Sequence, residues 1–190
     1  MKNIFLILSV LISLIAYIIG IYRIINGNFR PQRMTRFLLA FLALIFVMVL
    51  WARGDRNALY LALVMFLCNF IVFALSIKNG IGGTTKLDMV VFVMAIFSLI
   101  MWKITNNPVL GLVMSTMTDF IAMVPTIIKS WVLPWTEEWW FYISGTFSGV
   151  FNILSISVFT FATLAFPVYI FLVCTATGLI IIFRNKCLKK

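Results

Sequence analysis

The sequence contains no histidine, and only five of its 190 residues are acidic, so the commonest general base and metal ligand is missing. It also lacks the usual enzyme motifs: a His-Glu-x-x-His zinc site, a Gly-x-Ser-x-Gly nucleophile turn and a phosphate-binding loop. The three cysteines, Cys68, Cys174 and Cys187, have the spacing of neither a disulfide framework nor a metal site. We therefore expect no enzyme, no bound metal and no cofactor.

Charged residues are also scarce. They make up 11% of the chain, against about 25% in soluble domains, while 64% of the residues are hydrophobic. The net charge of +10 does not indicate nucleic-acid binding, because the basic residues fall between apolar segments and at the C-terminus. We expect a chain surrounded by a lipid bilayer, with no nucleic-acid partner.

Apolar runs separated by polar breaks predict an all-α membrane protein with seven transmembrane helices. The predicted spans are residues 4–25, 36–52, 58–77, 88–104, 108–128, 139–157 and 162–183. The last two spans come from one uncharged stretch, which is too long for a single span and about right for two with a turn near 159–164.

Lysine and arginine are distributed unequally between the two sides of the predicted bundle. If the N-terminus is outside, eleven basic residues lie inside and four, Lys2, Arg53, Arg56 and Lys103, lie outside. The inner set is Arg23, Arg30, Arg33, Arg36, Lys78, Lys86, Lys129, Arg184, Lys186, Lys189 and Lys190. Because cytoplasmic loops carry the excess of positive charge, we expect a multi-pass protein of the inner or plasma membrane with a cytoplasmic C-terminus.

The first three spans resemble the last three when the chain is shifted by 106 residues, the separation of Ser9 from Ser115. The same shift aligns Ser13 with Asp119 and Gly20 with Thr126. Such a repeat predicts two three-helix bundles, residues 1–87 and 108–190, joined by a linker helix within 88–107.

Two stretches carry a family resemblance: Tyr22 to Pro31, and Asp119 through Pro125-Thr126-Ile127-Ile128-Lys129 to Pro134 and Glu137. They resemble bacterial seven-span proteins related to the SWEET and PQ-loop transporters. The resemblance implies a 3+1+3 fold whose two bundles enclose a path for a solute. It places Asn69 and Thr175 where SWEET proteins have two pocket-lining asparagines. Because Thr175 lacks the amide, the implied solute is small and polar but not necessarily a sugar.

Asp119 is the only acidic residue deep within an apolar segment, near the predicted bilayer midplane. Ser115, Asp119, Ala122, Thr126 and Lys129 follow helical steps and therefore share one face. Acids within membranes usually have functional roles, and burial favours a neutral carboxyl, so we expect Asp119 to bind solute or a proton. The structural alternative is a buried aspartate bonded to Ser or Thr on a neighbouring helix.

Three more positions have two interpretations each. Asn69 needs a hydrogen-bond partner in the hydrocarbon, either as part of a pocket or as a contact between helices. Pro125 should bend its helix, and Gly20 marks the corresponding region of the first span. Both are hinge candidates, although kinks in membrane helices also serve packing.

The sixth predicted span carries a face of small residues that includes Gly145, Ser148, Gly149 and Asn152. This face predicts close approach of another helix in the same bundle, and a homo-oligomer is the alternative. Just before this span, Glu137 and Glu138 are expected to interact with its N-terminal dipole. An inner gate formed with Lys129 or with an arginine of the first loop is the second interpretation.

Two functions of different classes follow from these patterns. The first is a transporter that moves a small polar solute by alternating access, with proton linkage through Asp119. Its pathway residues are Asn69, Thr175, Asp119, Ser13, Ser115, Thr126 and Asn152, and its hinge residues are Pro125 and Gly20. The second is a membrane scaffold or receptor that uses the same bundle to bind a protein partner. Replacing Asp119 should affect the first function and not the second.

Overall fold

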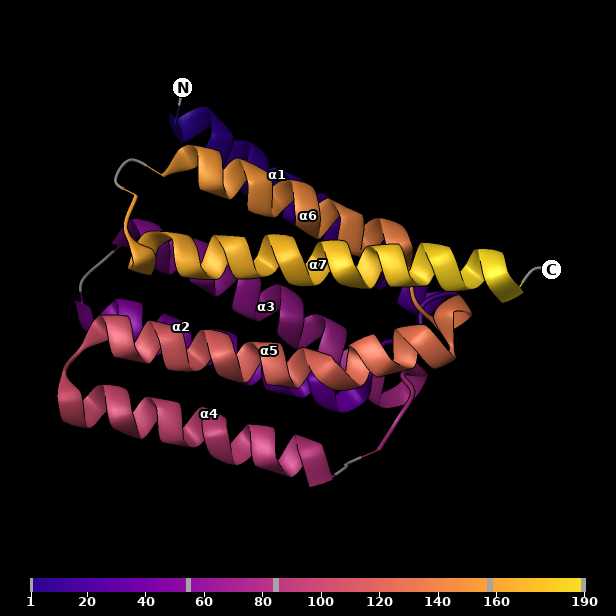
Figure 1. Ribbon diagram of the computed structural model, residues 1–190, viewed down its shortest axis with the longest axis horizontal. Helices are drawn as coiled ribbons and strands as arrows, with labels where there is room; N and C mark the ends of the chain where they lie inside the picture. The colour runs from indigo at the N-terminus through magenta and orange to yellow at the C-terminus, as the bar shows by residue number, and fades with distance from the viewer. Residues whose placement is uncertain (1, 54–55, 84–85, 157–158, 189–190) are drawn as a thin grey trace. The chain divides into compact units, whose positions relative to one another are not determined.

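The computed structural model describes residues 2–53, 56–83, 86–156 and 159–188 (Figure 1). Over these ranges the chain forms seven α-helices, one 3-10 turn and no strand, which confirms the all-α prediction. The helices are α1 (Lys2–Ile25), α2 (Arg33–Arg53), α3 (Arg56–Asn79), α4 (Lys86–Thr105), α5 (Pro108–Val132), α6 (Trp139–Ser155) and α7 (Phe161–Leu188), and the 3-10 turn η1 is Pro134–Thr136.

Each helix coincides with one predicted apolar span, because apolar runs of this length satisfy their backbone groups within a helix. Three segments of the described chain are long and apolar enough to cross a membrane: Lys2–Ile25, Asp88–Thr105 and Leu164–Leu188. Leu63–Asn79 is a shorter apolar helix. The predicted inner-side residues Lys189 and Lys190 lie outside the described ranges.

The contacts divide the chain into two units. The first contains Met1–Phe29 and Thr126–Lys190, and the second contains Arg30–Pro125. Helix α1 packs with α6, far away in the sequence. The predicted bundles, 1–87 and 108–190, stay a prediction. The two units are described separately below.

In the first unit, α6 packs against both α1 and α7 (Figure 1). Glycines permit this close packing: a Cβ added at Gly149 would come within 3.0 Å of the Phe171 backbone nitrogen, and one at Gly145 within 2.7 Å of the Cys174 sulfur. The small-residue face of α6 thus packs against a helix of its own unit, as the sequence predicted.

In the second unit, α2 packs against α3 and also contacts α4. Leu38, Val91 and Ala122 form one buried apolar cluster, with Phe37 and Phe92 packed against it. The segment before α2 is also joined to the segment after α3, because Ile81 donates its backbone N–H to the Pro31 carbonyl at 3.0 Å. Gly82, with φ of 89°, lies where Gln32 leaves no room for a Cβ.

Candidate functional site

Helix α5 carries the predicted polar face without interruption. It begins with a proline at the first helical position, and Asn107 Oδ1 caps it by accepting the Leu110 N–H at 3.3 Å. It continues through Pro125 to Val132. Ser115, Thr126 and Lys129 are buried on this helix, whereas Asp119 is only partly buried. Asp119 is therefore the most exposed of the polar residues on that face.

Asp119 lies between two neighbours on α5 with different exposures. Thr118 is fully buried and donates to the Met114 carbonyl at 2.7 Å, while the Phe120 side chain is half exposed. Along the helix, exposure therefore rises from Thr118 through Asp119 to Phe120. An acid on an apolar helix is costly in a membrane unless it has a polar partner or faces water, so a role of Asp119 in binding a proton or a solute stays a prediction.

Asn69 lies in α3 with 8% of its surface exposed. Its side-chain nitrogen donates to the Met65 carbonyl one turn earlier, at 3.0 Å. This bond satisfies one of its two amide hydrogens, as burial in an apolar segment requires. Its contribution to a solute pocket stays a prediction.

Ser13 belongs to a group of three serine hydroxyls that joins α1 to α6. Its Oγ lies 2.8 Å from Ser148 Oγ, and Ser9 Oγ lies 3.0 Å from the same atom. Ser9 also donates to the Ser148 carbonyl, and Ser148 donates back to the Ser9 carbonyl at 3.1 Å. All three side chains are buried. The predicted pathway residue Ser13 is thus part of a contact between helices.

Thr175 forms the equivalent contact between α6 and α7. Its hydroxyl lies 3.1 Å from that of Thr146 and donates to the Phe171 carbonyl at 2.6 Å. Sequence reasoning did not identify Thr146, although it directly follows Gly145 in the sixth span. Asn152 is partly buried on α6, and its backbone carbonyl accepts the Ser155 hydroxyl at 2.7 Å.

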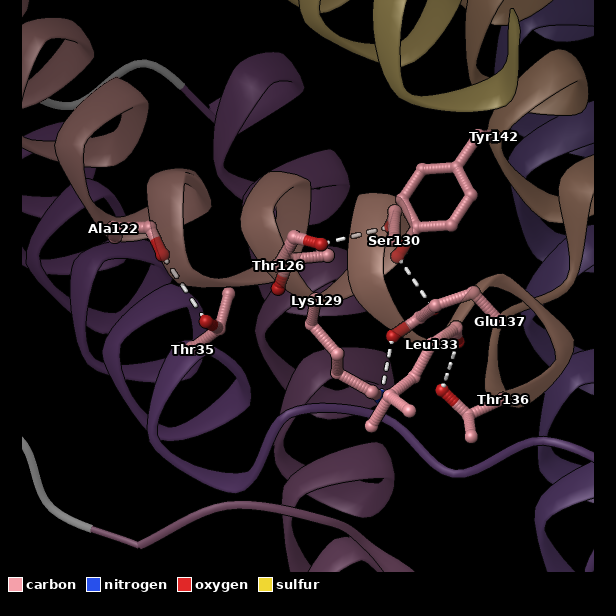
Figure 2. A network of polar contacts seen from close by, with 9 residues as sticks. All are labelled: Thr35, Ala122, Thr126, Lys129, Ser130, Leu133, Thr136, Glu137 and Tyr142. Atoms are coloured by element: carbon pink, nitrogen blue, oxygen red, sulfur yellow. Dashed lines mark hydrogen bonds and ion pairs between the residues drawn. The ribbon is translucent and has the colours of Figure 1, made fainter. Parts of the chain in front are cut away.

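The strongest polar interaction in the first unit is an ion pair buried where α5 ends (Figure 2). Lys129 Nζ lies 2.7 Å from Glu137 Oε1, and the two side chains are 6% and 0% exposed. The Tyr142 hydroxyl donates to the other carboxylate oxygen, Oε2, at 2.8 Å. Both oxygens of Glu137 are therefore bonded, which offsets much of the cost of burying its charge.

The turn η1 brings Glu137 back to Lys129. Thr136 Oγ1 donates to the Leu133 carbonyl at 2.7 Å (Figure 2). The Glu137 N–H donates to the Pro134 carbonyl at 3.2 Å. Pro134 favours such a turn because its ring fixes φ. Glu137 thus contacts Lys129, one of the two partners named in the second interpretation, and a gating role of this pair stays a prediction.

Glu138 forms a second, more exposed ion pair. Its Oε1 lies 3.0 Å from Arg23 Nη1 in the last turn of α1, and its Oε2 accepts the Trp140 indole N–H at 2.6 Å. Although Glu138 is the N-cap residue of α6, its side chain makes no capping hydrogen bond. It pairs with Arg23, near the first loop, and a gating role of this pair stays a prediction.

The two hinge candidates occupy different settings. Gly20 is buried, and a Cβ there would lie 3.3 Å from the Phe141 ring. It therefore permits the close approach of α6. Pro125 lies inside α5, and the boundary between the two contact units follows it. The bending roles of both residues stay predictions.

These polar groups belong to both contact units: Ser13, Thr126, Asn152 and Thr175 to the first, and Asn69, Ser115 and Asp119 to the second. Their contribution to one pathway stays a prediction. Within the described residues, no group of three or more Cys, Asp and Glu side chains is placed to hold a metal ion. In comparisons with known proteins, no family model, no curated protein and no solved structure matches this chain.

Proposed function

We propose that this protein is a small multi-pass membrane transporter that moves a small polar solute by alternating access. Its seven helices cross the inner or plasma membrane as bundles 1–87 and 108–190 with a linker helix between them, N-terminus outside and C-terminus in the cytoplasm. Asn69, Thr175 and Ser13 contact the solute, and Ser115, Thr126 and Asn152 line its path. Pro125 and Gly20 permit bending between the inward-facing and outward-facing states.

One observation carries this function: Asp119 is a partly buried carboxyl in the middle of an apolar helix. Placing an acid in that position within a membrane costs free energy unless the side chain faces water, a solute or a polar partner. Asp119 shares its helix face with Ser115 and Thr126, which supply hydroxyls one turn before it and two turns after it. In the proposed cycle it binds the solute or carries a proton with it. The resemblance to SWEET and PQ-loop proteins supports the same function.

A ligand screen followed by uptake measurements tests the proposal. Sugars, nucleosides, amino acids and vitamins are each added to the purified protein, and a solute that binds the folded state raises its melting temperature. Uptake of the solute that does so is then measured in proteoliposomes as a function of pH. Asp119→Asn should abolish the uptake or its pH dependence, whereas the matched control Glu138→Gln should retain both. Equal uptake by wild type and Asp119→Asn would exclude the proposed role of Asp119.

The second candidate function is a membrane scaffold or receptor for a protein partner. It is favoured by the hydroxyls of Ser13 and Thr175, which already bond to neighbouring helices of their own unit. Polar groups satisfied in this way stabilise a bundle without needing a solute. Under this function, Asp119→Asn leaves partner binding unchanged, and the ligand screen gives no stabilising solute.

A further inference from the structure

A basic and aromatic surface lies at one end of the first unit, where α5 and α7 terminate. Arg184 on α7 donates through Nε to the Trp131 carbonyl at 2.9 Å, and its Cζ lies 4.8 Å from the centroid of the Trp131 ring. A cation in this position is held by both the carbonyl and the ring face. The guanidinium is therefore fixed before any ligand arrives.

The rest of the Arg184 guanidinium is available for binding. Neither Nη1 nor Nη2 has a partner among the described residues, and Lys186, two positions further on, is exposed. Two parallel N–H groups of one arginine match two oxygens of a phosphate, a geometry that lysine cannot reproduce. The surface thus offers a forked donor at Arg184, and Lys186, which lies about 200° further round the helix, adds a positive charge at the same end of α7.

Nearby acids do not neutralise this surface. Glu137 is paired with Lys129 and Glu138 with Arg23, so the acids at this end of the unit already have basic partners. Arg184 and Lys186 therefore contribute uncompensated positive charge. An anion is the complementary ligand.

The surroundings of Arg184 favour a lipid over a soluble anion. Large apolar side chains near the end of α5, on η1 and on α7 are more than half exposed: Ile128, Val132, Trp135, Leu179 and Phe183. Turn η1 itself packs against α7. Tryptophan is enriched at the membrane interface, and basic residues there bind anionic headgroups. A headgroup phosphate at Arg184 would let acyl chains cover these apolar side chains.

We propose that Arg184, held by Trp131, is a binding site for the phosphate of an anionic phospholipid. This inference rests on the membrane placement in the proposed function and does not depend on transport. An uptake defect such as that of Asp119→Asn leaves lipid binding unchanged. The two ideas can therefore fail separately.

Native mass spectrometry of the full chain, released from detergent with defined lipids, tests the site. The probes are phosphatidylglycerol, phosphatidylcholine and inorganic phosphate. Wild type should retain phosphatidylglycerol in preference to phosphatidylcholine, and Arg184→Gln should lower its retention about tenfold because a charge-assisted contact is lost. The matched control Lys103→Gln removes one exposed charge at the end of α4 and should leave retention unchanged.

Three outcomes would overturn the proposal. Unchanged retention by Arg184→Gln would exclude the residue, and an equal loss in Lys103→Gln would show only a general effect of charge. Displacement of the lipid by millimolar inorganic phosphate would indicate a site for a soluble anion. If Arg184→Gln does not fold, Arg184→Lys replaces it as the test. This variant keeps the positive charge but should still retain less phosphatidylglycerol than wild type, because lysine lacks the two parallel N–H groups of arginine. Full retention by Arg184→Lys would contradict the bidentate contact.

Discussion

Replacing Lys129 by methionine should destabilise the protein far more than the loss of a surface charge would. The substitution keeps most of the side-chain volume but leaves the fully buried Glu137 carboxylate with the Tyr142 hydroxyl and no cation. Removing one member of a buried ion pair costs about 3–5 kcal/mol. This corresponds to a factor between about 10² and 10⁴ in the unfolding equilibrium constant.

The double variant separates the ion pair from the simple loss of two side chains. Lys129→Met combined with Glu137→Gln removes both charges, and the carbonyl oxygen of the introduced glutamine can still accept the Tyr142 hydroxyl. Because neutral replacement of a buried pair is often tolerated, the double variant should be more stable than either single variant, with a coupling energy of at least about 2 kcal/mol.

Unfolding by sodium dodecyl sulfate in mixed micelles, followed by tryptophan fluorescence, measures these differences. The control is the pair Arg23 and Glu138, whose arginine side chain is 40% exposed. Arg23→Met should cost only about 0.2–1 kcal/mol, because exposed pairs contribute little. Two results would refute the role of the buried pair in stabilising the turn. In the first, the changes in unfolding free energy of Lys129→Met and Glu137→Gln simply add in the double variant. In the second, Lys129→Met lowers the unfolding free energy by no more than Arg23→Met does.

Two further predictions concern the packing of α6. Ser148→Ala removes the hydroxyl shared by Ser9 and Ser13 and should cost about 1–2 kcal/mol in the same unfolding assay. Ser144→Ala, which loses only a bond to the Trp140 carbonyl of its own helix, should cost less, and equal costs would contradict the role of the serine group. Gly149→Ala should destabilise by about 1–3 kcal/mol because its Cβ would press on the Phe171 backbone. Gly83→Ala, with open space around it, is the control, and a similar loss there would refute the packing explanation.

The positions of the helices could be predicted from the sequence because hydropathy determines where an apolar chain becomes helical. Pro108 begins α5 and Pro134 begins η1, since proline removes a backbone donor and favours first turns. The orientation of the bundle in a membrane stays a prediction from the positive charges.

The partners of the polar side chains could not be predicted in the same way. Ser13 and Ser148 are 135 positions apart, and nothing in either apolar segment indicates which faces meet. A contact between Lys129 and Glu137 belonged to only one of the two interpretations of Glu137, because this contact depends on how η1 turns the chain. Tyr142 was missed, since a tyrosine near the start of an apolar helix is commonly an interfacial anchor.

The central claim, that Asp119 faces a water-accessible path, is tested most directly by cysteine labelling at that position. Asp119→Cys is made in a background without Cys68, Cys174 and Cys187, and intact membrane vesicles are treated with a charged, membrane-impermeant maleimide. The matched control is Phe120→Cys, the half-exposed neighbour on the same helix. The proposed transporter predicts rapid labelling at position 119 and little at position 120. Protection of position 119 from the charged reagent, with labelling by a lipid-soluble maleimide only, would contradict the claim.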